Sequence, residues 1–185
     1  MSKYSASAQL RFARAMINSD LETLSQSIEG ADVNSTTYLS MQPLVYALIN
    51  RDVDSCRLLI ELGADLPNAL VIAAEKGNIE IITIILDKDP SALNQKNSDG
   101  FTALHKAAAL NKQETVVYLL EQNADCSITS RFGLTAWDLA KDEIKELIAK
   151  YAESRGQPYT MDSKKSFREK LAEASAYGYG CGGCI

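Results

Sequence analysis

The sequence is poor in the side chains that most catalytic and metal sites need. Its 185 residues include one histidine, His105, and four cysteines, Cys56, Cys126, Cys181 and Cys184. A zinc hydrolase needs several nitrogen or sulfur ligands, and a general base needs a nucleophile or an orienting partner beside it. The sequence also lacks a glycine-rich phosphate loop after a strand. We therefore expect a protein that is not an enzyme and has no catalytic residues, metal ligands or cofactor.

Positive charge and long apolar runs are also scarce. Asp and Glu outnumber Lys and Arg by 24 to 19, which gives a formal net charge of −5. Nucleic acid binding rests largely on Lys and Arg that neutralise phosphates, so nucleic acid is not an expected partner. No apolar stretch approaches the ~20 residues that a transmembrane segment needs, and residues 1–18 lack the charge order of a signal peptide. We expect a cytoplasmic protein, although the sequence does not decide whether it enters a host cell.

The sequence does contain an internal repeat. A Gly-Ala-Asp landmark begins at Gly30 and returns 33 residues later at Gly63, and Asn123-Ala124-Asp125 is a third copy. A second landmark, rich in Ala and Leu, occurs at residues 42–48, 68–74, 99–108 and 133–140. The apolar residues between the landmarks follow a 3.6-residue period, which predicts amphipathic helices.

This unit of about 33 residues, with Thr-Ala-Leu-His at 102–105 and a Gly-Ala-Asp end, resembles the ankyrin repeat. The resemblance implies an all-α solenoid of about five helix-pair units over residues 10–152. Two caps are expected at 10–34 and 128–152, and three full units at 35–66, 67–94 and 95–127.

Individual residues take roles from this resemblance. Thr102 is expected to cap a helix, His105 to bond the turn to the neighbouring unit, and Trp137 to enter the core in place of the repeat's leucine. The stretch from Gly63 to Ala73 is about seven residues shorter than the matching stretch one unit earlier. A blunted or absent finger is therefore predicted there.

Ankyrin-like solenoids bind proteins on a concave surface built from finger tips and inner helices. The resemblance thus implies a protein–protein interaction module, an adaptor or effector, and we expect a monomer. The positions of that concave surface correspond in this sequence to the predicted partner-binding residues Tyr38, Tyr46, Ile49, Ile72, Lys106, Leu110, Arg131 and Phe132. Packing between units is the alternative role for Tyr46, Ile49 and Ile72.

Residues 153–185 lie beyond the repeat pattern and are predicted to be a linker, a short amphipathic helix and a flexible Gly/Tyr/Cys-rich tail. Phe167, Leu171 and Ala174 form one narrow apolar face, which fits a helix docked on the last repeat or one lying in the partner groove.

Two cysteines in this tail, Cys181 and Cys184, could form a disulfide, share a metal ion or be modified. Two alternative functions follow: a leader-like carrier whose tail is modified by a recruited enzyme, and a thiol redox or metal-carrying tail. By contrast, Cys56 and Cys126 are expected to be buried free thiols.

Overall fold

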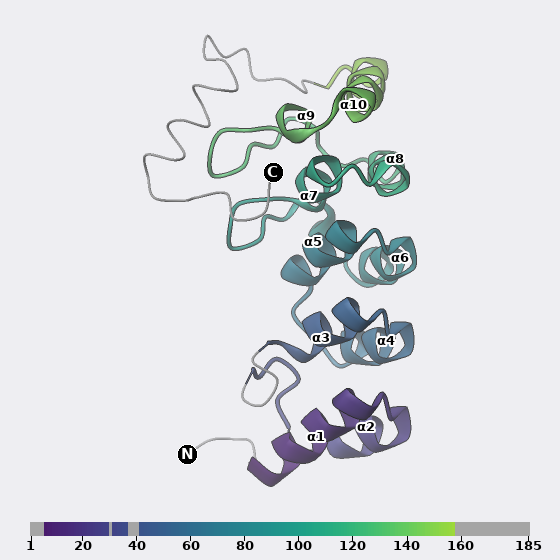
Figure 1. Cartoon of the computed structure of the whole chain (residues 1–185), viewed down its shortest axis with the longest axis vertical. Coiled ribbons are helices and arrows are strands. Elements are labelled where there is room, and N and C mark those ends of the chain that lie inside the picture. Colours follow the sequence, from purple (N-terminus) through teal and green to yellow (C-terminus); the bar gives the residue numbers. More distant parts are fainter. Residues whose placement is uncertain (1–5, 30, 37–40, 158–185) are drawn as a thin grey trace. The chain divides into compact units, whose positions relative to one another are not determined.

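The computed structural model describes residues 6–29, 31–36 and 41–157. The chain divides between Ala92 and Leu93 into two units, called unit 1 and unit 2 below, and no strand occurs among the described residues. The described helices are α1 (Ala6–Asn18), α2 (Leu21–Ser27), α3 (Pro43–Asn50), α4 (Val53–Glu61), α5 (Leu66–Lys76), α6 (Ile79–Lys88), the 3-10 helix η1 (Pro90–Asn94), α7 (Ala103–Ala109), α8 (Gln113–Glu121), α9 (Ala136–Leu139) and α10 (Asp142–Ser154) (Figure 1). The expected all-α repeat class is confirmed. None of the helices described here is long and apolar enough to cross a membrane.

Unit 1 consists of the helix pairs α1–α2, α3–α4 and α5–α6, which pack on one another in chain order. The helices α1, α3 and α5 form one row, and α2, α4 and α6 form the other. Small residues allow the close approach within the first row, since Ala47, Ala73 and Ala74 are at most 1% exposed. The larger Leu59 and Ile82, both fully buried, fill the space between the helices of the second row.

The second helix of each pair in unit 1 begins at a side-chain cap. Asp52, for example, accepts a hydrogen bond from the backbone N–H of Ser55 over 3.1 Å. Partial burial alone would raise the pKa of Asp52, but the bonds from Ser55 lower it below its usual value. Each such cap stabilises a helix by about 1 kcal/mol. The other caps of this kind are Asp20 on α2 and Asn78 on α6.

The finger predicted to be missing is absent from the structure. Helix α4 ends at Glu61 and α5 begins at Leu66, so only four residues connect them. Gly63 adopts the left-handed conformation, with φ of +85°, that a side chain would disfavour. Asn34 Oδ1 accepts a hydrogen bond from the N–H of Asp65 over 3.0 Å and thereby fixes this short connection.

Unit 2 contains the pairs α7–α8 and α9–α10, in which α7 packs on α9 and α8 packs on α10. Thr102 caps α7, as predicted, and Thr135 caps α9 in the same way 33 residues later. Leu104, on α7, is 2% exposed, and Leu119 and Ile148 are fully buried. The same landmark residues therefore build both helix pairs of unit 2.

Candidate functional site

Two of the predicted binding residues of unit 2, Lys106 and Phe132, contact an aromatic cluster at the base of two hairpins. We call this surface the unit 2 patch. The ring of Phe101 lies 6.2 Å from that of Phe132, centroid to centroid, and 5.9 Å from that of His105 in an edge-on arrangement. The Nζ atom of Lys106 lies 5.2 Å from the centroid of Phe101. The unit 2 patch consists of Phe101, Lys106, Leu110, Arg131 and Phe132.

The patch is accessible but held in place. Leu110 is 40% exposed at the end of α7, and Arg131 is exposed on its hairpin. Phe101, Lys106 and Phe132 are half-buried. Half-buried aromatic rings offer contact area while losing little side-chain freedom when a partner binds.

The two hairpins that carry the patch approach each other closely. The Arg131 guanidinium donates a hydrogen bond to the carbonyl oxygen of Ser98 on the preceding hairpin. Gly100 has φ of +80°, and a Cβ atom at this position would lie 2.8 Å from the backbone nitrogen of Arg131. A side chain at this crossing would force the Arg131 backbone to shift, so the two hairpins pack closely here.

His105 lies beneath the patch and is 1% exposed. Its Nδ1 accepts the backbone N–H of Thr102 over 3.3 Å, and its Nε2 lies 3.0 Å from the carbonyl oxygen of Leu134. The carbonyl can only accept, so Nε2 carries the proton and the ring is neutral. Burial is the main reason that the pKa of His105 is lowered. The predicted bond from this histidine to the neighbouring repeat is confirmed.

The unit 1 patch comprises Tyr46, Ile49 and Ile72. Tyr46 and Ile49 lie on α3, and Ile72 lies on the adjacent α5. Ile49 is 46% exposed, whereas Tyr46 and Ile72 are half-buried. Ile49 is thus accessible to a partner. Tyr46 and Ile72 are partly packed against other residues and partly exposed to solvent. Tyr38 lies outside the described residues.

One prediction about the core was wrong. Trp137 is half-buried, and the Nζ atom of Lys145 lies 5.0 Å from the centroid of its ring. It stands on α9, which is only four residues long. An indole is larger than the leucine it replaces and is rarely buried completely, so part of the ring faces solvent beside the lysine.

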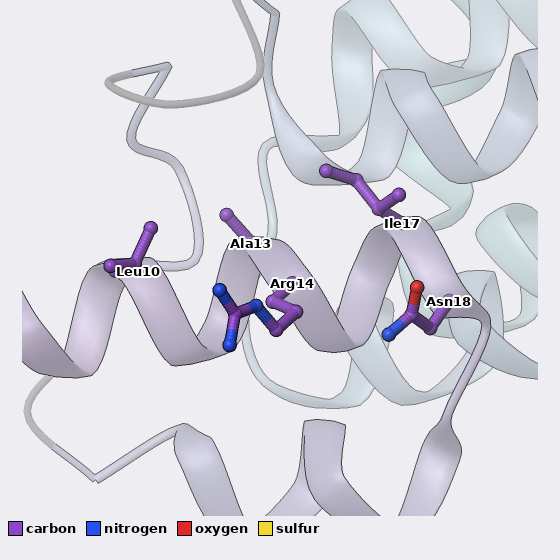
Figure 2. Close-up of a pocket in the computed structure, with 5 residues that line it drawn as sticks. All are labelled: Leu10, Ala13, Arg14, Ile17 and Asn18. Atoms are coloured by element: carbon purple, nitrogen blue, oxygen red, sulfur yellow. The ribbon is translucent and has the colours of Figure 1, made fainter.

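Two surfaces had no counterpart in the sequence analysis. The first is a stripe on α1, where Leu10, Ala13, Arg14, Ile17 and Asn18 line an open hollow of about 390 Å³ (Figure 2). Leu10 is 49% and Ile17 56% exposed. The hollow lacks the convergent polar groups of a small-ligand site. The second is a groove between α8 and α10.

The two described thiols are both fully buried, as predicted. Burial raises the pKa of Cys56 to about 12 and that of Cys126 to about 11. Both therefore remain protonated and unreactive at neutral pH. Within residues 6–29, 31–36 and 41–157, no group of three His, Cys, Asp or Glu side chains could hold a metal ion. Cys181 and Cys184 lie outside this part of the chain.

Comparisons with known proteins agree with this architecture. The family model for ankyrin repeats (three copies) matches residues 65–130. The ankyrin repeat protein YahD of Escherichia coli is 31% identical over 132 residues, which span 65% of this chain and 66% of that protein. Alpha-latroinsectotoxin-Lt1a of Latrodectus tredecimguttatus is 32% identical over 57% of the chain, and human diacylglycerol kinase iota is 33% identical over 75%.

The matched regions make up only 8% of the toxin and 14% of the kinase, so the chain corresponds to a small part of these longer relatives. The paired helices, threonine caps and bridging histidine that the ankyrin resemblance implied are all present in the structure of this chain. The chain belongs to the ankyrin-repeat family.

Proposed function

We propose that this protein is an adaptor or effector that binds a partner protein through the unit 2 patch, with the unit 1 patch as a second contact surface. Ankyrin repeats are protein–protein interaction modules, so the general class of function follows from the family. The proposal adds the surface, the residues and the chemistry of the partner. We further propose that the protein acts as a monomer in the cytoplasm.

The observation that supports the proposal most strongly is the aromatic cluster on two closely packed hairpins. Aromatic side chains and arginine are enriched at binding hot spots. In the unit 2 patch, Phe101 and Phe132 are half-buried and Arg131 is exposed. The close crossing of Gly100 and Arg131 orders the surface before a partner arrives, which reduces the entropy lost on binding.

The chemistry of the patch defines the partner. Leu110 and Phe132 offer apolar contact. The cationic groups of the patch are Lys106, whose Nζ lies over the Phe101 ring, and Arg131, whose guanidinium bonds to the Ser98 carbonyl. A complementary surface would insert an apolar side chain against Phe132 and place a carboxylate close to Lys106 or Arg131. We therefore propose a partner segment in which an apolar residue is flanked by acidic residues.

Binding is proposed in preference to catalysis. His105 is neutral, buried and engaged through both ring nitrogens, so it cannot contact a substrate. Human diacylglycerol kinase iota is named for an enzyme, but its matched region is 14% of its length. That region corresponds to the repeats, and we propose that this chain shares their binding role alone.

A photo-crosslinking amino acid placed at Phe132 tests the proposal in cells that express the protein. We expect it to trap a defined partner, which mass spectrometry can identify. The same amino acid at Tyr118, a half-buried aromatic position on α8 outside the patch, serves as the matched control. Equal trapping of that partner at both positions would contradict the proposal. If the partner were an enzyme that changes the mass of residues 177–185, the carrier alternative would replace the adaptor.

A further inference from the structure

The groove between α8 and α10 is a second site in unit 2, separate from the patch. Val117 and Leu120 of α8 and Leu147 and Tyr151 of α10 line an open space of about 250 Å³. This volume is below the roughly 300 Å³ at which small-molecule pockets begin, and the lining is mainly apolar. Such a groove fits one or two large apolar side chains of a helix better than a small ligand.

Two polar atoms near the C-terminal end of α10 lack a partner among the described residues, and one of them belongs to Tyr151, which lines the groove. The hydroxyl of Tyr151 and the Oε1 atom of Gln157 are shielded from solvent, yet neither makes a hydrogen bond with this part of the chain. Buried polar atoms in folded proteins nearly always have a partner. The Tyr151 hydroxyl can therefore pair with a polar group of a segment that enters the groove.

The chain itself leaves α10 at the end of this groove. The N–H of Gly156 bonds to the carbonyl of Glu153, and that of Gln157 to the carbonyl of Ala152, so that a left-handed glycine ends the helix. Six residues, 158–163, lie between Gln157 and the segment 164–176. Extended, they span up to about 20 Å, which matches the length of about 20 Å of the 13 residues of α10. A following segment can thus return along the whole groove.

The two helices that form the groove carry a net charge opposite to that of this segment, whereas the two charged residues that line the groove itself, Glu121 and Lys150, cancel. Helices α8 and α10 carry six acidic and two basic side chains. Residues 164–176 carry four basic and two acidic side chains. The apolar residues of this segment, Phe167, Leu171 and Ala174, have the spacing of one helix face.

From these observations we infer that residues 164–176 form a helix that docks in the groove between α8 and α10. Phe167 and Leu171 contact Val117, Leu147 and Tyr151. The basic residues of the segment lie along the acidic helices, and its polar groups pair with the Tyr151 hydroxyl. The C-terminal segment thereby closes the last repeat and remains separate from the partner-binding patch.

Hydrogen exchange of the full chain tests the inference. In the wild type we expect amides in 168–176 to exchange at least about tenfold more slowly than an unstructured peptide. Phe167→Asp places a charge on the docking face and should remove this protection. The matched control, Ala172→Asp, places the same charge on the opposite face and should leave the protection intact. Unprotected amides in the wild type, or equal loss in both variants, would overturn the inference.

A change on the groove side identifies the docking surface. Val117 is half-buried, so Val117→Lys should fold and should repel the basic segment. We expect it to remove protection of 168–176, as Phe167→Asp does. If the segment stayed protected in this variant, or if its protection in the wild type increased with protein concentration, it would dock elsewhere or on a second copy. Either result would contradict docking in this groove.

Discussion

The Nε2 atom of His105 donates a hydrogen bond to the carbonyl oxygen of Leu134 over 3.0 Å, and this bond joins the first turn of α7 to the next hairpin. The other ring nitrogen accepts from Thr102, the residue that caps the same helix. One neutral imidazole therefore completes a helix cap and connects two repeats. A proton on Nδ1 would remove the bond from the Thr102 N–H and would have to turn to Thr102 Oγ1, which lies 2.8 Å away.

Because the folded state needs a neutral His105, the stability of the protein should depend on pH. The pKa of His105 in the folded state is lowered below its ordinary value of 6.5, mainly by burial. The unfolded state therefore binds more protons as the pH falls below 6.5, and stability that is fully present above that pH is lost. Between about pH 7.5 and about pH 5 we expect the free energy of unfolding to fall more steeply in the wild type than in His105→Gln, by at most about 1.4 kcal/mol per pH unit. Parallel denaturation curves would contradict a neutral His105.

Leu104 should be a major contributor to the core of unit 2. The side chain is 2% exposed beside Ala107 and Ala108. Leu104→Ala removes buried surface and leaves a cavity, so we expect a loss of about 2–5 kcal/mol in chemical denaturation. Leu110→Ala, at a 40% exposed position, should change stability by less than about 0.5 kcal/mol. Similar midpoints for the two variants would show that Leu104 is not packed as described.

The features that could be predicted from the sequence are those fixed by repeat register or chain length. Thr102 and His105 stand at fixed places in a short motif, and the missing residues after Gly63 remove a finger directly. The exposure of Trp137 and the position of Phe101 depend on which side chains surround them in space. The periodic pattern does not carry that information, although the position of Phe101 between Gly100 and Thr102 was an available signal.

The groove between α8 and α10 could not be foreseen for a similar reason. The apolar residues of α8 and α10 follow the 3.6-residue period of any amphipathic helix, so the sequence does not set the lining residues apart. The space between α8 and α10 arises only when the two helices pack.

Alanine substitutions at two glycines test whether the two hairpins of unit 2 pack closely. Gly100 and Gly63 both have left-handed backbones, so alanine at either position is strained by roughly 1–2 kcal/mol. At Gly63 the space around a new Cβ is open, whereas at Gly100 it would meet the Arg131 backbone at 2.8 Å. Thermal unfolding should therefore show a larger loss for Gly100→Ala than for Gly63→Ala. Equal losses would mean that the hairpins do not pack closely.

The thiols should differ in their reaction with an alkylating reagent. Cys56 and Cys126 are buried, with pKa values raised to about 12 and about 11, so alkylation of the folded protein should be slow. The glycine-rich sequence around Cys181 and Cys184 predicts faster labelling there. Peptide mapping after a short exposure, under reducing and metal-free conditions, measures the order. Early labelling of Cys56 or Cys126 would contradict their burial.

The affinity of the identified partner for patch variants tests the central claim most directly. Phe132→Ala should weaken binding by at least about 1 kcal/mol, about fivefold in Kd, because it removes a half-buried aromatic contact of the unit 2 patch. Tyr118→Ala removes a half-buried aromatic ring on α8 and should leave Kd unchanged. Calorimetric titration of both folded variants measures the difference. Unchanged affinity for Phe132→Ala, or an equal loss for the two variants, would contradict binding through the patch.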